Sequence, residues 1–114
     1  MSFRNPDSVV NISNISNIVP DKYDLKQNYP NPFNPETTIE FDLKISGFVT
    51  LKVYDIMGRE VALLVNEKLP EGTFRKNFNS SNLPSGVYFY KINVSSENNS
   101  SLHFSETKRM ILMK

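Results

Sequence analysis

The stretch Thr38-Ile39-Glu40-Phe41-Asp42-Leu43 has an apolar side chain at every second position. Such alternation predicts a β-strand with one buried face, because successive side chains of a strand point to opposite sides. A second run begins at Gly47 and places Val49, Leu51 and Val53 on one face. We expect these two strands to pair with each other in a sheet.

Three further strand-like runs follow, each after turn residues. The run from Glu60 to Val65 is apolar after its first residue, which predicts a core strand covered on both faces. Residues 73–78 carry Lys76 on the same face as two phenylalanines, which indicates an edge strand or a lysine with a buried stem. Residues 87–94 form the most aromatic and β-prone part of the chain, and we expect them to be central in their sheet.

The predicted fold class is all-β: a seven-stranded, immunoglobulin-like antiparallel β-sandwich spanning residues 25–114. This count includes a short leading strand near Leu25 and a last run, residues 103–114, that is apolar on both faces near its end. An open barrel is the structural alternative. Residues 1–24 are dominated by Asn, Ser and Asp, so they bury too little apolar surface to offset the entropy lost on ordering, and we expect a flexible linker.

Composition argues against several classes of function. A formal net charge of +1, from 13 basic and 12 acidic residues, does not indicate the basic surface that binds nucleic acid or an anionic membrane. The chain has no cysteine and one histidine, His103, so we expect neither a metal site nor a cofactor. His103 also has no nucleophile elbow beside it, and we predict that the protein is not an enzyme.

The sequence was searched for a membrane-spanning helix and a signal peptide because both bear on cellular location. The longest purely apolar run, Val61 to Val65, is far shorter than the roughly 18 residues of a membrane-spanning helix, so no membrane span is expected. The first 20 residues lack the apolar region of a secretory signal peptide. If the protein is exported, we therefore expect this chain to be a piece of a larger precursor.

The segment Tyr29-Pro30-Asn31-Pro32-Phe33-Asn34-Pro35 contains three prolines. Proline fixes φ and favours extended backbone in the residue before it, so the segment is predicted to be rigid and to lie outside the strand ladders. Tyr29 and Phe33 are expected to cap one end of the sandwich as apolar plugs. Asn31 and Asn34 are expected to hydrogen-bond to adjacent backbone.

Together with three later motifs, this segment resembles the type A C-terminal sorting domains of the bacterial type IX (Por) secretion system. The similar motifs are residues 28–35 followed by Thr37-Thr38-Ile39, residues 53–61, residues 83–90 and residues 108–114, in the order that the family shows. The residues assigned to sorting and receptor recognition are Tyr29, Pro30, Asn31, Pro32, Phe33, Asn34, Pro35, Gly86, Val87, Tyr88, Lys108, Arg109, Met110, Ile111, Leu112, Met113 and Lys114. Lys76 departs from the family pattern, which has an apolar residue there.

The resemblance implies a domain that acts as an address for an upstream cargo. The precursor would pass through the periplasm, cross the outer membrane by the type IX translocon, and reach the cell surface or the medium. A sortase would then cut within residues 1–24 and remove the domain. The implied partners are therefore the outer-membrane translocon and the sortase complex of this system.

The residues themselves suggest how recognition works, and they leave alternatives open. The last strand, with Lys108 and Arg109 before its apolar centre and Lys114 after it, is suited to β-strand addition by a receptor, or is simply a closing strand. One alternative function is an immunoglobulin-like accessory or adhesion module, similar to the sandwich of the flagellar hook-capping protein. Another is a carbohydrate-binding module, which requires Tyr88 and Tyr90 to be exposed.

Overall fold

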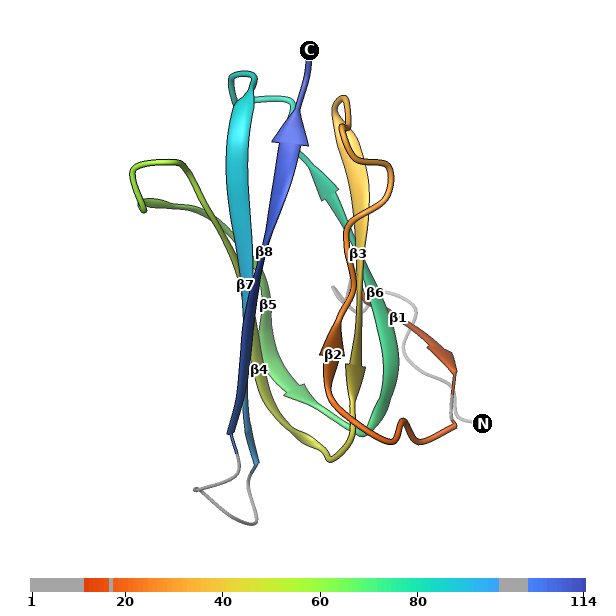
Figure 1. Ribbon diagram of the computed structural model, residues 1–114. Coiled ribbons are helices and arrows are strands. Elements are labelled where there is room, and N and C mark those ends of the chain that lie inside the picture. Colours follow the sequence, from red (N-terminus) through yellow and green to blue (C-terminus); the bar gives the residue numbers. More distant parts are fainter. Residues whose placement is uncertain (1–11, 17, 97–102) are drawn as a thin grey trace.

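The computed structural model describes residues 12–16, 18–96 and 103–114, and all regular structure in them is β (Figure 1). The predicted all-β class is thereby confirmed. Within the described ranges no helix exists that is long and apolar enough to cross a membrane. The strands are β1 (Ile12–Ser16), β2 (Asp24–Leu25), β3 (Glu36–Leu43), β4 (Gly47–Tyr54), β5 (Glu60–Leu69), β6 (Gly72–Asn79), β7 (Gly86–Ser96) and β8 (His103–Leu112).

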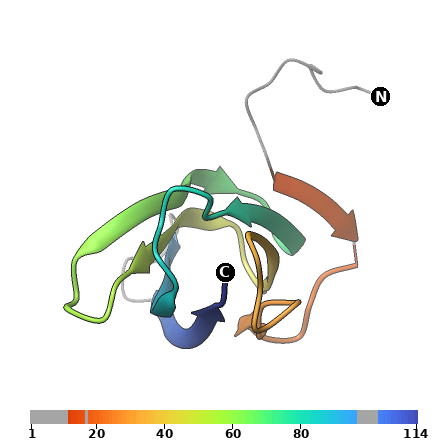
Figure 2. The ribbon, with the colours of Figure 1, turned by 90° about the horizontal axis from the view of Figure 1, so that it is seen from above.

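These strands form two antiparallel sheets that face each other (Figures 1 and 2). One sheet has the order β1-β6-β3-β2 and the other has the order β5-β4-β7-β8. Alternate residues of β3 and β4 are buried, as their sequence pattern predicts, and they meet in a shared core between the sheets. The buried side chains of this core include Ile39, Phe41, Leu43, Val49, Leu51, Val53, Tyr90, Ile92, Met110 and Leu112.

The expected pairing of β3 with β4 is wrong. β3 pairs with β2 and β6, whereas β4 pairs with β5 and β7. Residues 44–46 carry the chain from one sheet to the other, so the two alternating strands face each other across the core. Alternation specifies which face of a strand is buried, but it does not specify the neighbouring strand.

The position predicted for β5 is also wrong, while that of β7 is confirmed. β5 lies at the edge of its sheet, and Leu63 is 47% exposed, because none of the described strands covers the outer face of β5. Of the two readings of β6, the edge strand is wrong, because β6 lies inside its sheet between β1 and β3, whereas Lys76 is only 8% exposed, in agreement with a lysine whose stem is buried. β7 lies between β4 and β8, as expected for the most β-prone run.

Strand β1 explains why β6 is not an edge. It lies within residues 1–24, which were expected to be a flexible linker, and it pairs antiparallel with β6 through Ile12, Ser13 and Asn14. A polar segment becomes a strand here because the backbone groups of β6 need partners on that side. The described residues therefore contain one strand more than the seven that were predicted.

Candidate functional site

All four sequence motifs reach the same end of the sandwich, two of them by running along the paired strands β7 and β8. This motif end, at the top of Figure 1, is formed by residues 29–35, the turn at residues 55–59, the loop at residues 80–86 and residues 113–114 after β8. The connections at residues 44–46 and 70–71 lie at the opposite end. The motifs come together because β3 and β7 begin at this end while β4 and β8 finish there.

The Pro-rich segment, residues 29–35, lies along the outer edge of β8. The backbone N–H of Phe33 donates to the carbonyl of Ile111 at 2.9 Å, and the N–H of Met113 donates to the carbonyl of Phe33 at 3.0 Å. The N–H of Ile111 donates to Oδ1 of Asn31 at 3.0 Å. The segment was expected to stay outside the ladders, but it acts as a short parallel partner of the end of β8.

The two aromatic residues of this segment have different environments. Phe33 is 2% exposed, and its ring centroid lies 6.2 Å from that of Phe78 between the sheets. Phe33 therefore plugs the end of the sandwich as predicted. Tyr29 is 81% exposed, so its predicted role as a plug is wrong. Its backbone is bonded to Thr38 in both directions, which places the ring on the outer face of the sheet.

A buried polar network holds the start of the Pro-rich segment. Nδ2 of Asn28 donates to Oγ1 of Thr37 at 3.0 Å and to the carbonyl of Pro30 at 3.1 Å, and Thr37 donates to the same carbonyl at 2.8 Å. The hydroxyl of Tyr90 donates to the carbonyl of Lys26 and accepts from the N–H of Asn28, both at 2.7 Å. These bonds fix the segment to a central strand of the opposite sheet.

The turn between β4 and β5 is organised by Asp55. Its carboxylate accepts the backbone N–H groups of Met57 and Arg59 and the side-chain Nε of Arg59, each at 2.9 Å. Gly58 has φ +85°, a conformation that other residues rarely adopt. The turn is rigid, and it holds the side chains of Ile56 and Met57 out in solvent.

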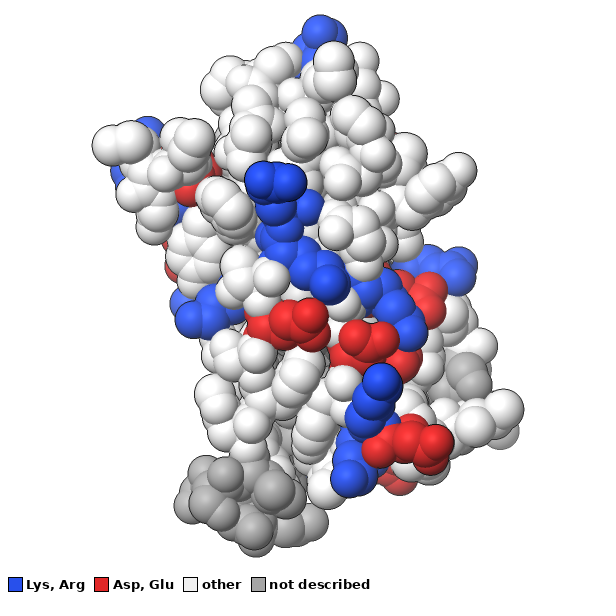
Figure 3. Space-filling view, viewed as in Figure 1, with Lys and Arg blue, Asp and Glu red and all other residues white. Residues whose placement is uncertain are grey.

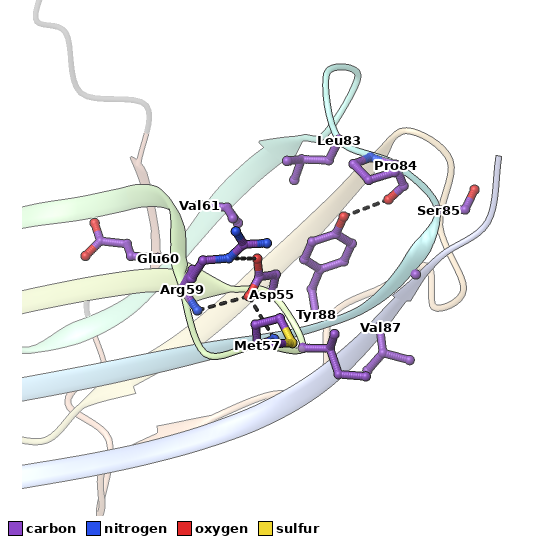
Figure 4. A pocket seen from close by; sticks show the side chains of 12 residues that line it. Asp55, Met57, Arg59, Glu60, Val61, Leu83, Pro84, Ser85, Val87 and Tyr88 are labelled. Atoms are coloured by element: carbon purple, nitrogen blue, oxygen red, sulfur yellow. Dashed lines mark hydrogen bonds and ion pairs between the residues drawn. The ribbon is translucent and has the colours of Figure 1, made fainter.

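This turn and the loop before β7 line an open pocket of about 550 Å³ (Figure 4). Its lining is mainly apolar, and the residues come from two motifs: Asp55, Ile56, Met57, Arg59, Glu60, Val61, Leu83, Pro84, Ser85, Gly86, Val87 and Tyr88. The hydroxyl of Tyr88 donates to the carbonyl of Pro84 at 2.7 Å, which shapes the loop. An open pocket of this size suits a side chain or short segment of a partner.

The residues after β8 are tied to this loop. The backbone N–H of Lys114 donates to Oγ of Ser85 at 2.9 Å, and its Nζ donates to the carbonyl of Ser81 at 2.8 Å. Met110 and Leu112 are buried in the core, whereas Met113 is exposed. The apolar end of the last strand is therefore mostly a packing element, and it is exposed only beyond Leu112.

A second hollow, of about 430 Å³, lies where the Pro-rich segment meets β8. It is lined by Gln27, Asn31, Phe89, Thr107, Lys108, Arg109 and Ile111. Nε2 of Gln27 donates to the carbonyl of Arg109 at 2.8 Å, so this backbone oxygen at the edge of β8 already has a hydrogen-bond partner. The two basic residues differ, because Arg109 faces solvent while Lys108 lies 3.4 Å from Oε2 of Glu106.

The charges around this site are mixed in sign. Acidic and basic groups gather across the middle of the face in Figure 3, and the motif end above them is mostly uncharged. Opposite charges are paired in the domain, for example Lys26 with Asp24 at 2.9 Å and with Asp42 at 3.4 Å. A partner of the motif end therefore meets apolar and hydrogen-bonding groups more than a field of one sign.

The structure brings some of the predicted site residues together and leaves others apart. Phe33, Asn31, Gly86, Val87, Tyr88 and residues 108–114 lie in or next to the motif end, but Asn34 makes none of the hydrogen bonds described above. Tyr88 and Tyr90 are buried, which excludes the aromatic row that a carbohydrate-binding module would need there. His103 is exposed on β8, and no group of three or more His, Cys, Asp or Glu in the described ranges is placed to hold a metal.

The stability of the turn is expected to depend on pH through the carboxyl group of Asp55. The hydrogen bond from the backbone N–H of Arg59 is the main cause that holds the pKa of the Asp55 carboxyl below its ordinary value of 3.8. The stability that this charge contributes is present above that value and is lost as pH falls through the lowered pKa. We expect the side-chain ¹³C signal of Asp55 to titrate below 3.8. Arg59→Ala should leave most of the shift, because the backbone donors remain, whereas a midpoint at 3.8 in the native chain would contradict this account.

Comparisons with known proteins place these features in a family. Residues 27–105 match the family described as secretion system C-terminal sorting domain. No curated protein matches the chain. The crystal structure of dimeric latent PorU from Porphyromonas gingivalis is similar over 87% of this chain and 10% of that protein, with 22% identity and a TM-score of 0.63. PorZ, an essential surface component of the type IX secretion system of the same organism, is similar over 82% of this chain and 12% of that protein, with 20% identity and a TM-score of 0.46.

The likeness to PorU shows a shared fold, and this chain spans only about a tenth of that protein's length. The family match covers the three motifs that contain the Pro-rich segment, the Asp55 turn and the loop before β7, and it ends at residue 105, before the motif at residues 108–114. The resemblance carried by these motifs is therefore confirmed. Because the matched residues make up well over half of the sequence, the chain belongs to the family of secretion system C-terminal sorting domains.

Proposed function

We propose that this domain is a non-catalytic address that a type IX translocon reads on a larger precursor, and that the precursor then reaches the cell surface or the medium. The gathering of the sequence motifs at one end of the sandwich supports this most directly, because separate segments must be folded together to form that surface. The rigid turn at Asp55 and the ordered Pro-rich segment add a preformed shape. A preformed surface lowers the entropic cost of binding.

We also propose how the strands form the sorting unit and where the precursor is cut. Strands β2 to β8 would form the seven-stranded immunoglobulin-like unit, and β1 would be an addition from the upstream segment. The sortase of the system would cut within residues 1–24 and release the domain. Recovery of surface-exposed material in which residues 1–24 and the domain are still joined would count against this cleavage.

β-Strand addition by the translocon is supported only for the first half of β8. The pairing of β7 with β8 is continuous from Gly86↔Leu112 to Ser95↔His103 without a register shift. The outward backbone groups of Ile111 and Met113 are bonded to the Pro-rich segment. By alternation, those of His103, Ser105 and Thr107 also face outward, beyond the part of the edge that the segment covers. We infer that a receptor strand pairs along these residues.

Export of a fusion protein tests the proposal. The full chain is fused behind a signal peptide and a fluorescent cargo in a bacterium with a type IX system, and surface fluorescence is compared with periplasmic fluorescence. We expect the fusion to reach the surface and a fusion without residues 108–114 to stay in the periplasm. Retention of the complete fusion in the periplasm would overturn the sorting role.

A matched pair of variants tests the strand-addition step separately. Proline is tolerated at an edge strand where its N–H would face solvent, so Ser105→Pro should preserve the fold while removing a donor that a receptor strand needs. Ser105→Thr keeps that donor. We expect Ser105→Pro to reduce export severalfold and Ser105→Thr to leave it unchanged, and equal export of both folded variants would exclude pairing at this edge.

A further inference from the structure

Charged side chains are distributed unevenly between the outer faces of the two sheets. The outward residues of a strand alternate with its buried residues or lie opposite an outward residue of the neighbouring strand. On the sheet β1-β6-β3-β2 the outward charges are mostly acidic: Asp24, Glu36, Glu40 and Asp42, with Arg75 and, just after β2, Lys26. On the sheet β5-β4-β7-β8 they are mostly basic: Lys52, Lys68, Lys91 and Arg109, with Glu60. This second face therefore attracts an anionic partner, although the net charge of the chain is only +1.

Two of the basic groups on this face have no counter-charge. In the described part of the chain, neither Lys91 nor Arg109 forms an ion pair, and the guanidinium group of Arg109 makes no hydrogen bond there. The two residues lie on neighbouring strands, because Lys91 is opposite Thr107 and Arg109 follows two residues later on the same face of β8. An anion beside Thr107 would therefore lie close to two unpaired cations.

The hollow beside Arg109 provides hydrogen-bond donors for such an anion. It is the hollow of about 430 Å³ described above, and none of the described residues that line it is acidic. Oδ1 of Asn31 already accepts the N–H of Ile111, so its Nδ2 group remains to donate. Nε2 of Gln27 is already used, since it donates to Asn28 and to the carbonyl of Arg109. Most of the remaining polar groups are donors, and a guanidinium group can bind both oxygens of one carboxylate.

This hollow lies at the place where a strand added to β8 would pass. The outward backbone of β8 is bonded to the Pro-rich segment at Ile111 and to Gln27 at Arg109, so an added strand would pair along the residues up to Thr107. The residue of that strand opposite Thr107 would place its side chain on the same face as Thr107 and diagonal to Arg109. Diagonal neighbours in a sheet are roughly 7–8 Å apart, a distance that long side chains span.

We propose that the segment that pairs with β8 carries an acidic residue opposite Thr107, and that the guanidinium group of Arg109 binds its carboxylate in this hollow. The inference rests on the strand addition proposed above and adds the chemistry of the partner. Backbone pairing supplies affinity for any extended segment, and the carboxylate selects among such segments. The described strands carry their own acidic groups mainly on the opposite face, so they supply no carboxylate to this hollow.

The first test measures peptide binding to the full chain. The probe is a fluorescein-labelled synthetic peptide, Thr-Val-Thr-Glu-Thr-Val-Thr, compared with the same peptide carrying Gln at its centre. We expect the Glu peptide to bind about tenfold more tightly. Arg109→Gln should remove this preference, and Arg109→Lys should keep part of it, because lysine retains the charge but not the planar fork of donors. Equal affinity of the two peptides would overturn the carboxylate site, whereas no binding of either peptide would contradict pairing at this edge.

The second test measures export of the cargo fusion. Arg75→Gln is the matched control, because Arg75 lies on the outer face of the opposite sheet and its side chain is 50% exposed. We expect surface fluorescence to fall severalfold with Arg109→Gln, to fall less with Arg109→Lys, and to stay unchanged with Arg75→Gln, while urea unfolding verifies that all three variants are folded. If the native fusion and Arg109→Gln are exported equally well, the carboxylate site is wrong and the sorting role stands. Retention of the native fusion would instead contradict the sorting role.

Discussion

Replacement of Phe33 by alanine is expected to lower the free energy of unfolding by about 3–5 kcal/mol, the usual cost of removing a buried aromatic ring. The ring is 2% exposed and packs near Phe78 between the sheets. Its loss also loosens the Pro-rich segment, whose backbone bonds to Ile111 and Met113 cover the end of β8. Because small domains are stable by only about 5–15 kcal/mol, this single change should bring the domain close to unfolding.

The same segment provides a matched control. Tyr29 lies four residues earlier, and its side chain is 81% exposed, so Tyr29→Ala should change stability by less than about 0.5 kcal/mol. Urea unfolding measures both variants. Hydrogen exchange at the amides of Ile111 and Met113 should accelerate in Phe33→Ala and stay unchanged in Tyr29→Ala. Similar losses in the two variants would mean that Phe33 does not hold the segment.

The contrast between Phe33 and Tyr29 also shows how far sequence patterns reach. Period-2 alternation predicted the buried faces of β3 and β4 because burial on one face leaves a direct trace in the sequence. In the Pro-rich segment the side chains follow no such period. The sequence therefore does not show which of the two aromatic side chains is buried. Only the path of the backbone along β8 distinguishes them.

Sheet order was less predictable than strand identity. Three residues join β3 to β4, a length typical of a hairpin, yet they connect two different sheets. β5 has an apolar sequence but lies at an edge, and β1 has a polar sequence but is paired. In each case the neighbour is set by the topology of the whole domain, which local composition does not encode.

The polar network of the site was missed for a related reason. Asn28 and Tyr90 are 62 positions apart, and no local pattern indicates that a tyrosine in an apolar run will bond to this backbone. The motifs did mark the correct region, because residues 28–35 and 83–90 both contribute to it.

Removal of the Tyr90 hydroxyl is also expected to lower the stability of the domain strongly. Tyr90→Phe removes a group that donates to Lys26 and accepts from Asn28, and it leaves a buried N–H and a carbonyl without their partner. We expect a loss of about 2–3 kcal/mol at neutral pH, from the cost of leaving such groups unsatisfied. Urea unfolding of the two proteins measures the difference. Tyr29→Phe, which alters an exposed ring, is the control and should be neutral.

The difference between native protein and Tyr90→Phe should shrink at alkaline pH. Burial raises the pKa of Tyr90 to about 12 from its ordinary value of 10.0. Above pH 10 the unfolded chain loses this proton while the folded chain keeps it, so the native protein loses stability as pH rises toward 12. A shift of about two pKa units corresponds to roughly 3 kcal/mol, which is similar to the advantage at neutral pH. The variant lacks this ionisation, so its curve should approach that of the native protein near pH 12, and a constant gap between pH 8 and pH 12 would show that Tyr90 does not titrate as a buried phenol.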